Sequence, residues 1–188
     1  MKIAISGSAG IGKTTLAKAL ATRLGVDFIA EGYEPMFDRP GRFHGDFAGL
    51  PQVIRQILET KHTLEQRAGS FVADRCPADL MRLWLARETE APLLADLRAF
   101  EARCRLYMAD YDAVVIPPFD VFKLEQQNIG ATGFRVLDYW SQLRSYAGIS
   151  GLVMHFAGSG RVITIPDSVP PGGWVDFIID HLRHRSIN

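Results

Sequence analysis

Apolar residues divide the chain into short runs that alternate with longer segments of helical spacing. The short runs indicate strands at residues 2–6, 26–30, 70–74, 113–116, 152–156 and 162–165. Between them, apolar residues recur every three or four positions, as at Leu16, Leu20 and Leu24. This spacing predicts helices over 13–24, 50–67, 78–87, 93–108, 134–148 and 173–185. The alternation predicts one α/β domain over residues 1–188, with a mainly parallel sheet and helices on both of its faces.

The segment GSAGIGKTT at residues 7–15 follows the first predicted strand and opens the first predicted helix. It fits the pattern G-x-x-x-x-G-K-[ST] of a phosphate-binding loop, whose glycines let backbone N–H groups surround phosphate oxygens. Lys13 should reach the β- and γ-phosphates of ATP, and the Thr14 hydroxyl should bind Mg²⁺. The nucleotide-contacting residues are expected to be Gly7, Ser8, Ala9, Gly10, Ile11, Gly12, Lys13, Thr14 and Thr15. With this loop, the expected fold is the three-layer P-loop NTPase fold, with a five-stranded sheet in the order 2-3-1-4-5.

The motif leaves open whether the γ-phosphate goes to water or to an acceptor molecule. Motor-type ATPases commonly end a strand in Asp-Glu, whereas here strand 70–74 ends in Asp74 followed by Arg75. Asp74 is a candidate to hold Mg²⁺, directly or through water, and Arg75 a candidate to contact an anionic or hydroxyl-rich acceptor. The alternative is a structural Asp–Arg pair at a helix start.

Glu31 comes directly after the second predicted strand, which puts it at the same sheet edge as the phosphate loop. A carboxylate there can orient or deprotonate an acceptor hydroxyl, and Glu34 is the other candidate for this role. Both acids begin a segment rich in glycine and proline, residues 31–48, which we interpret as an acceptor-side loop.

Three arginines in the predicted loops are further candidates. Arg39 and Arg42 could meet a phosphate on the acceptor, and Arg135 closes an irregular, lid-like segment at 117–135. A lid arginine can neutralise a phosphoryl group in transfer. Each could instead be a solvated surface residue. Residues 158–161, Gly-Ser-Gly-Arg, are a candidate loop for the nucleotide base or a plain turn.

Composition narrows the class of protein. The 188 residues carry 21 basic and 21 acidic side chains, so no net charge draws the chain to nucleic acid or anionic lipid. Two cysteines without metal-ligand spacing argue against a disulfide framework or a zinc site. No apolar run reaches the length of a membrane span, and the N-terminus lacks a signal-peptide pattern. We expect a cytoplasmic protein without a membrane partner.

These motifs together resemble the small P-loop kinases of nucleosides and nucleotides, and most of all the nicotinamide-riboside-kinase-type, AAA-like ATP-binding domains. The resemblance covers about residues 1–165 and rests on GSAGIGKTT at 7–15, EGYEP at 31–35, ADRCPADL at 73–80, and YDAVVIPP with a later GFR within 111–135. It implies phosphate and metal roles for Lys13, Thr14 and Asp74, an acceptor contact for Arg75 and a lid role for Arg135.

The sequence therefore predicts a Mg²⁺- and ATP-dependent phosphotransferase acting on a small acceptor, most simply a nucleoside or nucleotide. Two other classes stay open. One is a P-loop ATPase that serves as a switch or regulatory module, and the other is a kinase that acts on a base or an end within nucleic acid.

Overall fold

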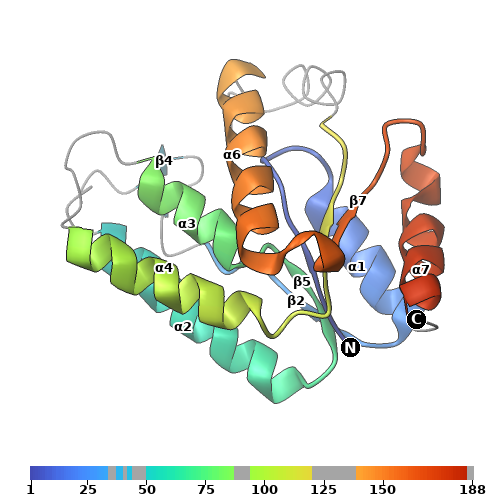
Figure 1. Cartoon of the computed structure of the whole chain (residues 1–188), viewed down its shortest axis with the longest axis horizontal. Coiled ribbons are helices and arrows are strands. Elements are labelled where there is room, and N and C mark those ends of the chain that lie inside the picture. Colours follow the sequence, from blue (N-terminus) through green and yellow to red (C-terminus); the bar gives the residue numbers. More distant parts are fainter. Residues whose placement is uncertain (34–36, 40–41, 44–49, 87–93, 120–138, 186–188) are drawn as a thin grey trace.

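Five parallel strands form the central sheet of the molecule (Figure 1). The computed structural model describes residues 1–33, 37–39, 42–43, 50–86, 94–119 and 139–185. The sheet strands are β1 (Lys2–Ile5), β2 (Asp27–Ile29), β5 (Phe71–Asp74), β6 (Ala113–Ile116) and β7 (Val162–Thr164). Their spatial order is β2-β5-β1-β6-β7, and each neighbouring pair is parallel. In chain order this is 2-3-1-4-5, so the predicted fold class is confirmed.

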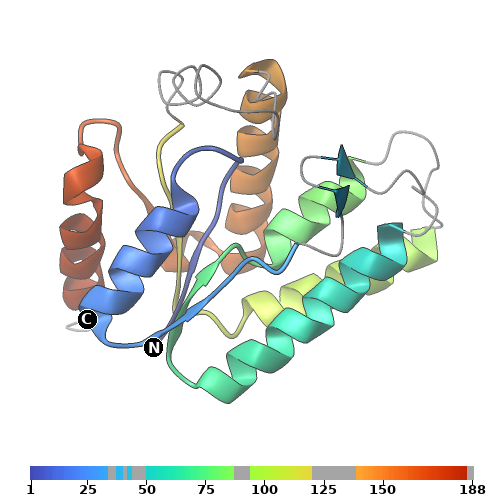
Figure 2. The same cartoon turned by 180° about the vertical axis from the view of Figure 1, so that it is seen from behind.

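Helices cover both faces of the sheet (Figures 1 and 2). One face packs against α1 (Lys13–Leu24) and α7 (Trp174–Arg185), the other against α2 (Leu50–Ala68), α3 (Pro77–Leu85), α4 (Leu94–Met108) and α6 (Tyr139–Ala157). Alternate residues of a strand point to opposite faces. Accordingly, Ile3 and Ile5 of β1 belong to the α1–α7 core, whereas Ala4 belongs to the larger core on the other face.

The strand predicted at residues 152–156 is wrong, because these residues form the last turns of α6. A short apolar run fits a strand or a buried helix equally well when it is taken alone. The buried residues Ile149, Val153, Phe156 and Ala157 recur at helical spacing, so the run continues the helix that precedes it.

Part of the segment predicted as an irregular loop at 31–48 forms a small hairpin. Its backbone pairs β3 (Phe37–Arg39) with β4 (Arg42–Phe43) in antiparallel fashion. The loop prediction counted Pro40 and Gly41 among the glycines and prolines of the segment, but did not use this dipeptide as a turn signal between two strands.

Within the described ranges, no helix combines the length and the apolar character that crossing a bilayer requires.

Candidate active site

The loop between β1 and α1 has the backbone conformation of a phosphate cradle. Gly7, Gly10 and Gly12 have φ values of 138°, 84° and 87°, a region that side chains rarely adopt. Gly12 is the N-cap of α1 and offers no side-chain cap to the first turn of the helix. The first N–H groups of the helix are therefore left for an anion, with the positive end of the helix dipole behind them.

Lys13 lies inside this cradle rather than in solvent. Its side chain is only 5% exposed, and Nζ donates a hydrogen bond to the backbone oxygen of Ser8. Burial lowers the pKa of Lys13 to about 7, and Arg75 adds to this effect, while the carboxylates of Asp79, Asp74 and Glu31 oppose it. The ammonium therefore lacks a full counter-charge, which a bound polyphosphate would supply.

Thr14 and Asp74 meet where α1 begins and β5 ends. The Thr14 hydroxyl donates its hydrogen to Oδ2 of Asp74, so the lone pairs of the Thr14 oxygen stay available to a ligand. Oδ1 of Asp74 is buried and accepts no hydrogen bond. Because a buried carboxylate oxygen without a partner is costly, this pair fits the position of a divalent cation beside the phosphates.

Arg75 turns back from the end of β5 toward the phosphate loop. Its φ of 71° is unusual for a residue with a side chain. Nε donates to Oε2 of Glu31 at 2.7 Å, and Nη1 donates to Oδ1 of Asp79 at 2.9 Å and to the backbone oxygen of Gly7 at 3.3 Å. One guanidinium thus joins the carboxyl end of β2, the start of α3 and the phosphate loop.

Asp79 is a site residue that the sequence analysis did not single out. It is 1% exposed, and its Oδ2 accepts from the Ser6 hydroxyl at 2.6 Å and from the Cys76 backbone N–H at 3.0 Å. The sequence signal was present, because Pro77 and Asp79 occupy the first and third positions of α3, where proline and an acid are favoured. The sequence did not reveal that the Asp79 carboxylate forms a buried ion pair with the Arg75 guanidinium.

Tyr33 closes this group from the side of β2. The Arg75 guanidinium carbon lies 5.0 Å from the centre of the Tyr33 ring, within the range of a cation–π contact. The side chain is buried, and its hydroxyl has no hydrogen-bond partner. Burial and the neighbouring Asp79 charge raise the pKa of Tyr33 well above its usual value. The uncharged Tyr33 ring therefore packs against the Arg75 guanidinium and fixes the orientation of its plane.

Comparison with known proteins identifies the family of this chain. A family model described as an AAA domain matches residues 2–128, which include the phosphate loop, Glu31, Asp74, Arg75 and Asp79. The chain belongs to this AAA-domain family. No curated protein matches it in sequence.

Solved structures share the fold of this AAA domain at low sequence identity. The NadR protein in complex with NR superposes with a TM-score of 0.69 at 17% identity, over 95% of this chain and 50% of that protein. The chain thus spans half the length of NadR. Deoxyadenosine kinase from M. mycoides gives a TM-score of 0.69 at 12% identity, over 98% of this chain and 100% of the other.

Shikimate kinase from Acinetobacter baumannii gives a TM-score of 0.60 at 16% identity, over 100% of this chain and 95% of the other. At these identities the similarity demonstrates the fold. The predicted AAA-like ATP-binding domain is confirmed as the family of this chain, and the predicted P-loop kinase fold is shared with these structures.

The structure describes the remaining predicted site residues only in part. Glu34 and Arg135 lie outside the described residues, as does most of the predicted lid at 117–135. Arg39 ends β3 and Arg42 begins β4, and only their backbone is described.

The candidate base-binding loop at 158–161 lies at the wrong edge of the sheet. It leads into β7 as a 3-10 turn, Ser159–Arg161, whereas the phosphate loop follows the carboxyl end of the parallel strand β1. Arg161 donates to the backbone oxygens of Ala157, Met108, Ala109 and Tyr111, so it holds the ends of α4 and α6 together.

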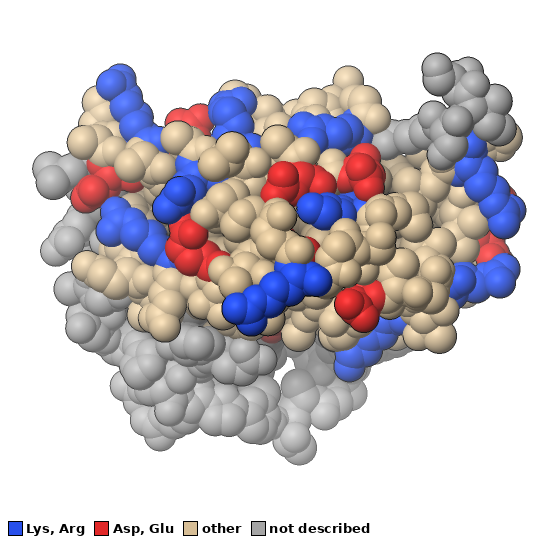
Figure 3. All heavy atoms as spheres, turned by 90° about the horizontal axis from the view of Figure 1, so that it is seen from below, with Lys and Arg blue, Asp and Glu red and all other residues tan. Residues whose placement is uncertain are grey.

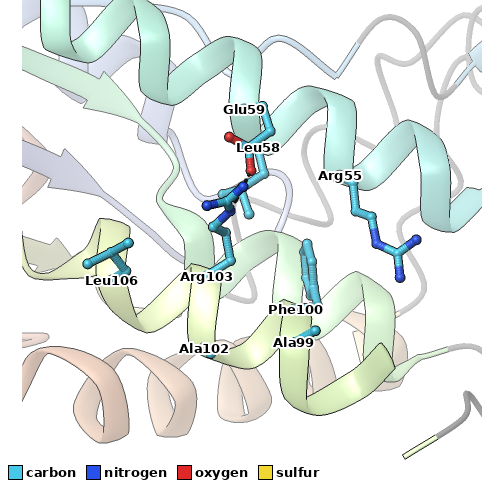
Figure 4. Close-up of a pocket in the computed structure, with 8 residues that line it drawn as sticks. All are labelled: Arg55, Leu58, Glu59, Ala99, Phe100, Ala102, Arg103 and Leu106. Carbon is cyan, nitrogen blue, oxygen red and sulfur yellow. Dashed lines mark ion pairs between the residues drawn. The ribbon is translucent and has the colours of Figure 1, made fainter. Parts of the chain in front are cut away.

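A surface groove between α2 and α4 is separate from this site (Figure 4). The Arg103 guanidinium points across it to the Glu59 carboxylate, with Nε and Oε1 2.9 Å apart. The residues that line it are Arg55, Leu58, Glu59, Ala99, Phe100, Ala102, Arg103 and Leu106. None of the residues predicted for nucleotide or acceptor binding lines it.

Proposed function

We propose that this AAA domain is a Mg²⁺- and ATP-dependent phosphotransferase that moves the γ-phosphoryl group to a small hydroxyl-bearing acceptor, a nucleoside or a nucleotide. The observation that carries the proposal is the Glu31–Arg75 pair. It lies at the end of β2, two strand positions from β1, and Arg75 also bonds to Gly7 of the phosphate loop. An acceptor bound at this edge would have a fixed carboxylate beside it and the γ-phosphate within reach.

Each group has a distinct task in this proposal. The phosphate loop and Lys13 would bind the triphosphate, and Thr14 with Asp74 would hold Mg²⁺, which supplies charge neutralisation at the transferring phosphoryl group when it is bound. Glu31 would accept a hydrogen bond from the acceptor hydroxyl and orient it for attack. Asp79 and Tyr33 would keep Arg75, and through it Glu31, in place.

The residue that follows Asp74 supports transfer to an acceptor rather than to water. An acid at that position would have provided a second carboxylate to prime a water molecule. Here the position is Arg75, a cation whose Nε and Nη1 are already engaged by Glu31 and Asp79. The proteins of similar fold include structures with NR, with the products dCMP and dCDP, and with shikimate, all of them small molecules.

A kinase acting within nucleic acid receives less support. The chain carries 21 basic and 21 acidic side chains, so it lacks the net positive charge with which nucleic-acid-binding proteins neutralise successive phosphates. The two kinds of side chain are interspersed on the face seen in Figure 3, which lies on the side of the sheet away from the phosphate loop.

The deciding experiment measures ADP release by the purified chain with MgATP and a panel of nucleosides, nucleotides, NR, shikimate and oligonucleotides. Lys13→Ala is the blank, and Lys18→Ala, an exposed lysine on the same helix, is the matched control. We expect strong stimulation by one small acceptor together with its phosphorylated product. ADP release that ignores every acceptor would assign the chain to the ATPase switches instead.

The role of Glu31 is tested in the same assay. Glu31→Gln keeps the shape of the side chain but removes its negative charge, so kcat should fall by about 100-fold while ATP affinity changes by less than about twofold. Unchanged kcat in this variant would transfer the role to Glu34.

A further inference from the structure

A buried lysine lies beneath the two strand ends that carry the proposed acceptor site. Lys61, on α2, is 6% exposed. Its Nζ donates to the backbone oxygen of Ala30 at 3.1 Å and to that of Asp74 at 2.9 Å. Ala30 follows β2 and Asp74 ends β5, so one ammonium group bridges the carboxyl ends of two neighbouring strands.

These two carbonyl groups belong to the peptide bonds that lead directly into Glu31 and Arg75. On the other side of the second peptide, the Arg75 N–H donates to the backbone oxygen of Ile5 at 2.8 Å. Arg75 adopts a positive φ only because its surroundings impose that conformation. Lys61 and Ile5 together hold the peptide that aims the Arg75 guanidinium at Glu31.

Lys61 has its own buried counter-charge one turn along the helix. Its Nζ is 3.8 Å from Oε1 of Glu65, which also accepts from the Tyr111 hydroxyl at 2.7 Å. Burial lowers the pKa of Lys61 and raises that of Glu65, and each opposes the shift of the other. Buried ion pairs of this kind add little stability compared with well-packed neutral residues. Stability alone therefore does not account for an ammonium at this position.

We infer that Lys61 is a positioning residue for phosphoryl transfer, which holds the ends of β2 and β5 so that Glu31 and Arg75 meet in their productive geometry. The inference rests on the proposed function for its kinetic consequence. Its structural content, that the Glu31–Arg75 contact depends on Lys61, holds independently of activity.

The test variant removes the bridge without leaving a buried charge unpaired. Lys61→Met combined with Glu65→Gln makes both positions neutral, and the glutamine still accepts from Tyr111. Glu65→Gln alone is the matched control, and Arg67→Met controls for loss of an exposed cation from the same helix. Thermal unfolding confirms that each variant is folded, and Lys61→Arg retains donors for both carbonyl groups.

We expect the double variant to lose about 100-fold in kcat with the acceptor, because a misplacement of about 1 Å in a reacting group has an effect of that size. Its affinity for a non-hydrolysable ATP analogue should stay within about twofold of wild type, since the two hydrogen bonds from Lys61 go to Ala30 and Asp74 and not to the phosphate loop. Lys61→Arg should recover most of the lost kcat. If kcat in the double variant equals that of Glu65→Gln, Lys61 has no positioning role.

A second readout does not require activity. The Arg75 Nε–H, bonded to Glu31, should exchange slowly with solvent in a ¹⁵N NMR spectrum, with its signal assigned through Arg75→Lys. We expect this protection to be lost in the double variant. Protection that persists unchanged overturns the inference. Absence of phosphotransfer by the wild-type chain, with protection lost in the variant, overturns only the proposed function.

Discussion

Protonation of Lys13 should couple nucleotide binding to pH. Burial, with a further contribution from Arg75, lowers the pKa of this lysine to about 7 from an ordinary value of 10.5. A bound triphosphate places negative charge beside the ammonium and restores its protonation. Affinity should therefore be full below pH 7 and should fall as the pH rises above it, because each binding event must then take up a proton.

The size of the effect follows from that pKa. At pH 8 about 0.9 of the free protein carries neutral Lys13, so binding should take up about 0.9 proton. Above pH 7 the association constant should approach a fall of about tenfold per pH unit. Calorimetric titration with a non-hydrolysable ATP analogue, in buffers of different ionisation enthalpy, measures the uptake directly.

The matched control is Lys13→Arg, because a guanidinium stays charged over this pH range. It should bind the analogue without proton uptake, and it reports any exchange that belongs to the nucleotide itself. Equal proton uptake by the wild type and Lys13→Arg at pH 8 would refute the lowered pKa of Lys13 as the source of the pH dependence.

Three further substitutions test the site and its surroundings. Asp79→Asn leaves Arg75 without its buried partner, so the free energy of unfolding in urea should fall by about 3 kcal/mol, whereas Asp96→Asn, at an exposed ion pair, should change it by less than about 1 kcal/mol. Asp74→Asn should raise the Mg²⁺ concentration for half-maximal activity by about tenfold, and an unchanged Mg²⁺ titration would exclude Asp74 from the metal site. Arg161→Ala should lower the free energy of unfolding in urea by about 2 kcal/mol and leave kcat unaltered, because the hydrogen bonds of Arg161 lie at the end of the sheet away from the phosphate loop. A loss of kcat in a folded Arg161→Ala protein would contradict that location.

The charges of the site form one interdependent group. Lys13 and Arg75 are buried beside Asp74 and Asp79, and Glu31 completes the group at the solvent side. In such a low-dielectric setting each charge depends on its neighbours, so single substitutions should not have additive effects.

Local sequence alone determined the phosphate loop and most of the sheet. The loop is recognisable because all its functional groups lie within nine consecutive residues, and its glycines meet a backbone requirement that few other residues satisfy. The positions of Asp74 and Glu31 at neighbouring strand ends were predictable for a related reason. The ends of parallel strands lie at one edge of the sheet, so a residue that follows a strand can be located without coordinates.

The contacts that hold the site together were decided only by the tertiary structure. Ser6 meets Asp79 across 73 residues of chain, and Arg75 meets Glu31 across 44. Lys61 follows Ile57 and Leu58 at helical spacing, which puts it on the buried face of α2. Only the packing of α2 against the sheet shows that its ammonium meets two strand ends. The strand predicted at 152–156 was wrong for the same physical reason. A short apolar run specifies burial, but whether it is buried as helix or strand depends on what packs around it.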